Sequence, residues 1–420
     1  MTKEKKNVIW NIIGASANAF ISLLLSIIVT RINGTFDAGI FIYCFATACL
    51  LYYIGNYSGR TFQVTDISKE NSDTDYIYNR IFTCTIMLIV SILFSLIKRY
   101  DLYKASILII LCVYKCIEAL AESLYAIVQK RGNLYKVGIS MFLKSVLSTI
   151  AFLIIDYFTK NLILASTGAV VINIIFILLY DIKNIKEVKL EKTKFTPKAN
   201  LRLLKIGFFT FVLTFLGTYL INSPRYAIDD ILESDLQTIF GIIIMPASFM
   251  GLLGQYIIQP SLTKLSNAIE SKKYFELSKI IKKLILLVLG IGIVVFAIAW
   301  LLEVPVLKFV YGVELIPYFF SMMIIIFGSI LYSLSFVLSS ILIAMRKTLG
   351  QTIIYGITSV ISTVMAYMFV NKIGIEGASI TYTFTMGIMA MSFLIYVTIN
   401  MKKYKEQWKI NENINNNSNI

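Results

Sequence analysis

The sequence contains no histidine, and only 15% of its 420 residues are charged. The five cysteines, at positions 44, 49, 84, 112 and 116, all lie inside apolar runs, and Cys112 and Cys116 are one helical turn apart. A bound metal ion needs several closely spaced ligands, and neither a histidine nor a cluster of carboxylates accompanies these thiols. We therefore expect the cysteines to be packing residues, and we expect no metal site and no cofactor.

Long polar segments are also missing. No segment between two apolar runs is longer than about 25 residues, and the sequence has no nucleotide-binding motif. A membrane glycosyltransferase or polysaccharide polymerase needs a sizeable catalytic loop outside the membrane or an acidic metal motif, and neither is found. We therefore expect no enzyme, no catalytic residues and no direct use of ATP.

Apolar residues dominate the chain. They make up 57% of it, and the mean hydropathy is +0.76, which indicates a polytopic membrane protein. Each apolar run is long enough to cross the bilayer as a helix, and the short alternating pattern of a membrane barrel is absent. The predicted fold class is all-α, with about twelve transmembrane helices near 8–30, 38–56, 81–97, 105–128, 137–155, 161–180, 203–222, 236–258, 282–302, 317–344, 351–370 and 375–400.

The cations are distributed unevenly between the two sides of these spans. With the N-terminus inside, the cytoplasmic segments hold 29 Lys and Arg residues and the opposite side holds 8. Because cations are enriched in cytoplasmic loops, both termini are expected to be cytoplasmic, in a multi-pass protein of the cell membrane. The net charge of +15 comes from many short loops rather than from one basic module, so we expect no nucleic-acid partner.

The chain repeats itself. The segment SLYAIVQKRGNLYK at 123–136 resembles SILIAMRKTLGQTI at 340–353, about 216 residues later, and SVLSTI at 145–150 returns as SVISTV at 359–364. Six spans separate the equivalent segments, so the repeat is parallel, as in transporters built from two six-helix lobes. We predict an N-lobe at 1–180, a basic cytoplasmic linker at 181–202, a C-lobe at 203–401 and a polar cytoplasmic tail at 402–420.

Charges inside the apolar runs are the first candidate site. Lys115, Glu118 and Glu122 share one helix face, and Lys144 lies in the next span. Lys115 could pair with Glu118 or Glu122, and Lys144 with the other carboxylate. Such a set is either a buried ion-pair network that fixes helix register or a proton or cation site. At the repeat offset the three charges of span four become leucines, so we expect the N-lobe to be the chemically active half.

Three arginines are candidates for binding an anion. Arg31 and Arg225 follow the first span of each half, and Arg60 lies beyond Gly55 and Gly59, which permit a bend. A guanidinium is a bidentate ligand for phosphate, although each arginine could also pair with nearby acids or anchor a helix end. Among the tyrosines, Tyr53 and Tyr57 could stack on sugars, while most of the others should pack or lie at the membrane interface.

The sequence resembles Wzx-type flippases of oligosaccharide repeat units, in the multidrug/oligosaccharidyl-lipid/polysaccharide exporter (MATE-like) superfamily. The resemblance spans the chain and rests on NIIGASANAFISLLLSIIVTRINGTFDAGIF, IGNYSGRTFQVTD, ILESDLQTIFGIIIMPASFMGLLGQYIIQPSLTKLS, KFVYGVEL and GIEGASITYTF. It implies transfer of an undecaprenyl-pyrophosphate-linked glycan from the inner to the outer leaflet for O-antigen- or capsule-type polysaccharide. The implied partners are this glycan, membrane lipids, and the polysaccharide polymerase and chain-length machinery.

The resemblance also implies roles for the candidate residues. Arginines in the cavity of such flippases bind the pyrophosphate, which matches Arg31, Arg60 and Arg225, and Lys115 and Lys144 join them as candidate substrate ligands. Glu118 and Glu122 would couple transport to an ion gradient. The alternative is a cation-coupled exporter of small amphipathic compounds, but the acid that drug exporters typically carry in span one is missing from VIWNIIGASANAFISLLLSIIV.

Overall fold

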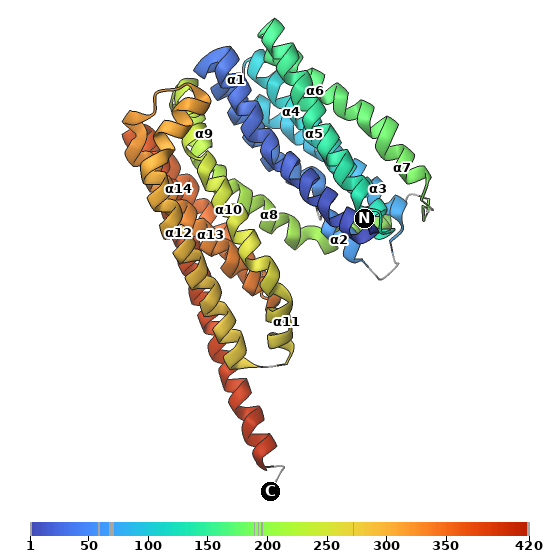
Figure 1. Ribbon diagram of the computed structural model, residues 1–420, viewed down its shortest axis with the longest axis vertical. Coiled ribbons are helices and arrows are strands. Elements are labelled where there is room, and N and C mark those ends of the chain that lie inside the picture. Colours follow the sequence, from blue (N-terminus) through green and yellow to red (C-terminus); the bar gives the residue numbers. More distant parts are fainter. Residues whose placement is uncertain are drawn as a thin grey trace. The chain divides into compact units, whose positions relative to one another are not determined.

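A computed structural model describes residues 2–57, 59–66, 71–188, 190–191, 193–194, 196–271 and 273–417. Every regular element in these ranges is a helix (Figure 1). The α-helices are α1 (Lys3–Asn56), α2 (Gly59–Thr65), α3 (Asp73–Ile97), α4 (Leu102–Lys130), α5 (Leu134–Thr159), α6 (Leu162–Phe176), α7 (Ile182–Lys186), α8 (Pro197–Ile231), α9 (Ser234–Ile243), α10 (Met245–Ile258), α11 (Leu262–Glu270), α12 (Tyr274–Tyr311), α13 (Phe319–Ala344) and α14 (Thr348–Asn417). Three short helical turns complete them: η1 (Ile177–Asp181), η2 (Gln259–Ser261) and η3 (Ile316–Tyr318).

The prediction of about twelve spans is confirmed. Nine helical stretches in the described ranges are long and apolar enough to cross a membrane. Two of them contain a break that separates two spans: α1 at Gly34 and α14 at Gly374, where φ is +84° and +58°. Glycine reaches such angles without the steric penalty that a side chain adds. The halves of these two helices, counted separately, and α4, whose 29 residues include three charges near the middle, bring the number to twelve.

The chain divides into two compact units, Met1–Thr218 and Tyr219–Ile420, which we call the N-terminal and the C-terminal unit. The division falls inside α8, so the first half of this helix belongs with the N-terminal unit. The lobe and linker boundaries expected from the sequence, with a linker at 181–202, therefore stay a prediction.

In the N-terminal unit, α4 is the central helix and packs against α1, α2, α3 and α6. α1 and α5 lie side by side (Figure 1). Their backbones approach closely at two glycines, because a Cβ added to Gly14 would lie 2.3 Å from the carbonyl oxygen of Gly138. A larger residue at either position would force the two helices apart.

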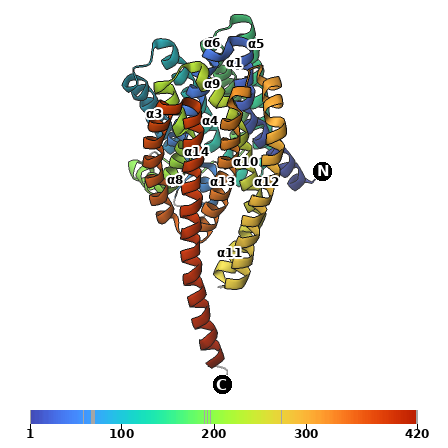
Figure 2. The same cartoon turned by 90° about the vertical axis from the view of Figure 1, so that its left-hand side faces the viewer.

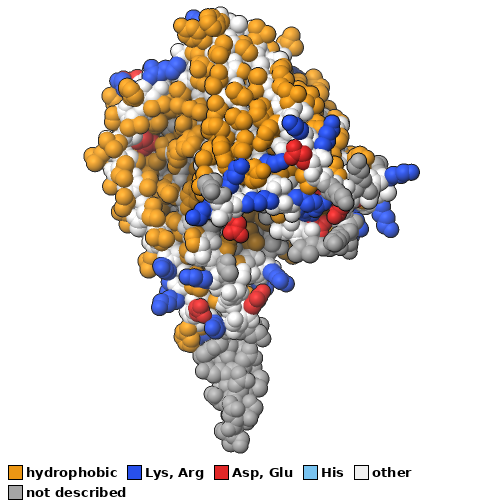
Figure 3. Space-filling view, turned by 45° about the vertical axis from the view of Figure 1, so that its right-hand side comes forward, with side chains coloured by type: hydrophobic (Ala, Val, Ile, Leu, Met, Phe, Trp, Pro, Cys, Tyr) orange, Lys and Arg blue, Asp and Glu red, His pale blue; other side chains and the backbone are white. Residues whose placement is uncertain are grey.

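In the C-terminal unit, α13 is the central helix and packs against α10, α12 and α14. α11 lies beside the first part of α12, and α14 continues from its break to Asn417 (Figure 2). On the face drawn in Figure 3, hydrophobic side chains cover much of the surface, and Lys and Arg side chains lie on it in several separate groups. Large exposed apolar side chains such as Leu96, Leu286 and Ile293 are typical of a surface that faces lipid.

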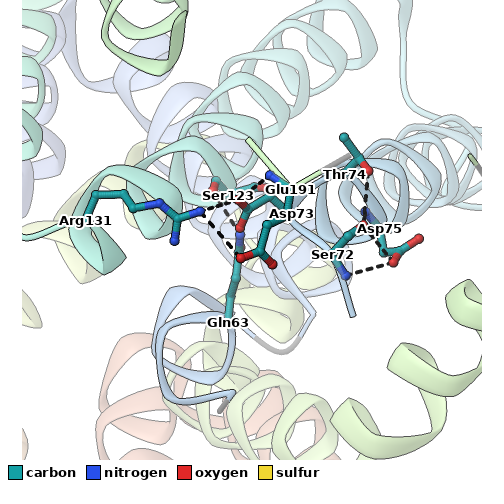
Figure 4. Close-up of polar contacts among 8 residues, drawn as sticks. All are labelled: Gln63, Ser72, Asp73, Thr74, Asp75, Ser123, Arg131 and Glu191. Carbon is teal, nitrogen blue, oxygen red and sulfur yellow. Dashed lines mark hydrogen bonds and ion pairs between the residues drawn. The ribbon is translucent and has the colours of Figure 1, made fainter. Parts of the chain in front are cut away.

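The segment before α8 is held on the N-terminal unit by polar contacts around Asp73 (Figure 4). This carboxylate is buried and accepts hydrogen bonds from Arg131 Nη2 at 3.3 Å and from the backbone N–H of Glu191 at 3.2 Å. The Thr193 N–H donates to Thr74 Oγ1 at 2.8 Å, and Ser72 and Asp75 form a capping box that begins α3. These contacts fix residues 191 and 193 against the start of α3.

Candidate functional site

The charges on α4 form the centre of the candidate site. Lys115 Nζ lies 2.7 Å from Glu118 Oε2, and Asn18 of α1 donates to Glu118 Oε1 at 3.2 Å. Of the two partners that the sequence left open for Lys115, the structure therefore shows Glu118. The Lys115 ammonium also lies 5.0 Å from the ring centroid of Phe45, in a cation–π arrangement. The stripe on α4 thus faces α1.

Arg60 reaches the second carboxylate of the stripe. Its Nε lies 3.5 Å from Glu122 Oε2, and its Nη1 lies 3.9 Å from Met141 Sδ on α5. The arginine stands on α2, which begins at Gly59 with φ +74°. The expected bend is therefore present at Gly59 but not at Gly55, which lies inside α1, and Arg60 contacts Glu122 of α4.

The expected pairing of Lys144 with a carboxylate of α4 is wrong. Lys144 Nζ lies 2.9 Å from Asp181 Oδ2, and both side chains are less than 10% exposed. Ser140 donates to the other oxygen of Asp181 at 2.6 Å, and Tyr125 of α4 shares a hydrogen bond with Ser140 at 2.9 Å. Asp181 was missed because it lies just past the predicted end of span six, where it was counted with the linker.

A small cavity lies among these groups inside the N-terminal unit. It holds about 20 Å³, which is enough for one water molecule. Its polar lining comes from α1, α4, α5 and α6 and consists of Asn18, Glu118, Glu122, Lys144 and Asn173 among others. Two carboxylates, an ammonium group and two amides therefore surround one space that can hold water.

A further buried cation was not singled out from the sequence. Arg80 of α3 is 4% exposed, and its Nη1 donates to the carbonyl oxygen of Gly55 at 3.0 Å. Thr83 donates to the same carbonyl at 2.7 Å. Arg80 directly precedes an apolar run and so looked like a loop cation. The signal that could have identified it is Gly55, where the end of α1 lets α3 approach closely.

The other predicted residues are Arg31, Arg225, Tyr53 and Tyr57. Arg31 is exposed and lies three residues before the break at Gly34, whereas Arg225 is buried in α8 after Pro224, in the C-terminal unit. Tyr53 lies in the last turns of α1. Tyr57 donates its hydroxyl to the Leu204 carbonyl at 3.1 Å, and one face of its ring stacks on Phe211 at 4.8 Å. Phe211 therefore already occupies one face of the ring that was expected to stack on a sugar.

Comparisons with known proteins give the following results. No protein-family model matches the chain. The "Capsular polysaccharide biosynthesis protein CapF" of Staphylococcus aureus is 25% identical over 410 residues, covering 93% of this chain and 98% of CapF. A MATE family multidrug resistance transporter of the MOP superfamily, solved inward-facing, aligns with a TM-score of 0.71 at 12% identity, over 94% of this chain and 99% of its own.

Two further solved structures share the fold. The lipid II flippase MurJ, in an inward closed conformation, aligns with a TM-score of 0.69 at 15% identity, over 96% of this chain and 91% of its own. The Vibrio cholerae MATE transporter VcmN, in the bent form, aligns with a TM-score of 0.61 at 11% identity, over 96% and 98% of the two chains. These alignments extend over nearly the whole of each chain. The chain is therefore a multi-pass membrane protein with the fold of the multidrug/oligosaccharidyl-lipid/polysaccharide exporter (MOP) superfamily, as its sequence resemblance implied.

Proposed function

We propose that this protein flips an undecaprenyl-pyrophosphate-linked oligosaccharide unit from the inner to the outer leaflet of the cytoplasmic membrane, for surface polysaccharide synthesis. The full-length match to a capsular polysaccharide biosynthesis protein supports the pathway, and the fold shared with a lipid II flippase supports the activity. The observation that carries the proposal is the half-buried contact between Arg60 and Glu122. The contact places the guanidinium of Arg60, which can bind phosphate, beside the carboxylate of Glu122, which an incoming anion can displace.

The geometry suggests how an anionic cargo would use this contact. Arg60 and Lys115 each form a salt bridge with a carboxylate, so neither cation lies within the membrane without a counter-ion. A pyrophosphate carries more charge than a carboxylate and binds a guanidinium through two parallel hydrogen bonds. It would displace Glu122 from Arg60. Glu122 would then lie beside Glu118 without its cation, and the repulsion would favour uptake of a proton or another cation.

This exchange links binding of the cargo to the charge state of Glu122, and release of the cargo would restore its pair with Arg60. In this proposal an ion gradient drives transport through these carboxylates. Lys144 is already paired with Asp181. Its positive charge would therefore attract the pyrophosphate without contacting it. In this proposal both termini are cytoplasmic, the conformations alternate access to the two leaflets, and Arg31 and Arg225 add positive charge along the path of the pyrophosphate.

Complementation tests the function. In a strain lacking the chromosomal gene, wild-type protein should restore surface polysaccharide, while Arg60→Ala should leave lipid-linked units on the inner leaflet. Arg131→Lys, which keeps the cation beside Asp73, is the matched control and should restore wild-type levels. Membrane abundance is measured for every variant. Normal surface polysaccharide in the deletion strain, without accumulated lipid-linked units, would contradict the flippase and favour the drug-exporter alternative.

A binding measurement tests the role of Arg60 directly. Purified protein should bind farnesyl pyrophosphate, used here as a short prenyl pyrophosphate probe. Arg60→Ala should weaken binding about tenfold to a hundredfold, because a charge-assisted hydrogen bond contributes about 1.5–3 kcal/mol. Glu122→Gln removes the competing anion and should bind the probe more tightly than wild type. Equal affinities for all three proteins would exclude Arg60 as a ligand.

A further inference from the structure

Glu303 of α12 is a buried acid that the proposed transport site does not use. It is 6% exposed, and neither carboxyl oxygen has a hydrogen-bond partner within the described ranges. It shares a buried stripe with Leu307 and Tyr311, one and two turns further on. Leu302 and Val306, on the other side of the helix, are more than half exposed. The carboxyl group therefore points into the C-terminal unit rather than toward lipid.

The described residues place no salt-bridge partner beside Glu303. The helix that carries it, α12, packs against α10, α11, α13 and α14. At the same end of the unit, Asp230 of α8 accepts a hydrogen bond from Tyr367 of α14. Lys308 pairs with Glu314, and Lys372 and Glu376 of α14 are exposed. An ionised carboxylate in such a place would cost several kcal/mol.

The lack of donors around Glu303 also disfavours a carboxylate. An ionised carboxyl group accepts hydrogen bonds at both oxygens, and neither oxygen of Glu303 meets a donor within the described ranges. Pro305, two residues further along α12, has no N–H to offer. The surroundings therefore favour the neutral acid.

We propose that Glu303 is a proton-binding site of the C-terminal unit, occupied by a proton in this conformation. A metal ion would need several oxygen ligands, and the described residues contain no group of three or more acids or thiols that could hold one. Glu118 and Glu122 differ, because each has a cation within 3.5 Å. The role of this proton in transport rests on the proposed function: when water reaches this end of α12 during the transport cycle, Glu303 would release its proton.

Infrared spectroscopy tests the protonation state without depending on transport. Full-length protein in lipid nanodiscs should show, at neutral pH, the carbonyl stretch of a protonated carboxyl group, and Glu303→Gln should lose that band. Glu376→Gln, which changes an exposed glutamate of the same unit, is the control and should keep it. An unchanged band in Glu303→Gln would overturn the proposal.

Thermal unfolding gives a second, independent readout. A group that holds its proton in the folded state stabilises the fold at low pH, and this stability is lost as the pH rises. A glutamate in the unfolded chain ionises at about pH 4.3, so this stability is lost from mildly acidic pH upward. The melting temperature of wild type should therefore fall more than that of Glu303→Gln between about pH 4 and mildly alkaline pH. Glu303→Met, an apolar residue of similar size, should behave like Glu303→Gln. Parallel pH profiles for all three proteins, or failure of both variants to fold, would contradict a neutral Glu303.

Discussion

The central helices of the two units, α4 and α13, correspond to each other in the sequence repeat but carry different chemistry. α4 has Lys115, Glu118 and Glu122, and at the repeat offset α13 has Leu331, Leu334 and Leu338. Both helices pack at the middle of a unit of similar length, so the charges of α4 are not needed to build such a unit. Charges that the fold does not require, at positions where they are costly, point to function.

The polar side chains of α13 show how a buried helix avoids that cost. Ser329 and Ser340 donate to carbonyl oxygens of their own helix at 2.6 and 2.9 Å. Such hydroxyls need no partner from another helix. Lys115 and Lys144, by contrast, depend on a single carboxylate each. We therefore expect the loss of one partner to cost more stability in the N-terminal unit than in the C-terminal unit.

The first prediction removes the difference between the two central helices. In Lys115→Leu with Glu118→Leu, α4 carries at these positions the residues found in α13. We expect surface polysaccharide in the complementation assay to fall to the level of the deletion strain. The double variant should stay at wild-type abundance, because replacing a buried ion pair by apolar residues is often neutral or stabilising.

The matched control for this double variant is Glu118→Leu alone. This single substitution leaves Lys115 without its carboxylate partner. It should lower the free energy of unfolding by about 3–5 kcal/mol, the usual effect of leaving a buried charge unpaired. Full surface polysaccharide from the double variant would mean that the pair only fixes helix register. The functional contrast between α4 and α13 would then be lost.

The second prediction concerns the buried pair of Lys144 and Asp181. Asp181→Ala should reduce the free energy of unfolding by about 3–5 kcal/mol, because the ammonium group of Lys144 then stays buried without its counter-ion. Adding Lys144→Met should recover most of this loss. The coupling between the two substitutions, measured by thermal unfolding of the four proteins, should exceed about 2 kcal/mol. Additive effects would show that the pair contributes little.

The spans could be predicted from the sequence because each apolar run has to cross the membrane as one helix. The internal repeat likewise follows from residues alone. The breaks at Gly34 and Gly374, where one span follows another without a loop, could not be predicted, because a short polar stretch can form either a loop or a break between two helices.

The candidate site could be predicted only in part. The stripe on α4 follows from helical periodicity, which brings Lys115 within reach of Glu118. Partners on other helices depend on packing, which the sequence does not contain. For this reason the sequence did not predict that Asp181 pairs with Lys144 or that Arg80 is buried. Glu303 was missed for another reason: it falls one residue past a predicted span, where an acid looked like part of a loop.

The third prediction tests whether the C-terminal unit is in fact less sensitive. Ser339 of α13 donates to Gln351 Oε1 of α14 at 2.8 Å, and Gln351 donates back to the Ser339 carbonyl at 3.1 Å. This is a link between helices made without charge. Ser339→Ala should cost about 1–2 kcal/mol in the free energy of unfolding, since one neutral hydrogen bond is lost and a buried amide oxygen is left without its donor. Ser340→Ala, where the lost bond lies within one helix, should change it by less than about 0.5 kcal/mol. A cost for Ser339→Ala as large as that of Asp181→Ala would show that buried polar links between helices are equally critical in both units, and that charge is not what separates them.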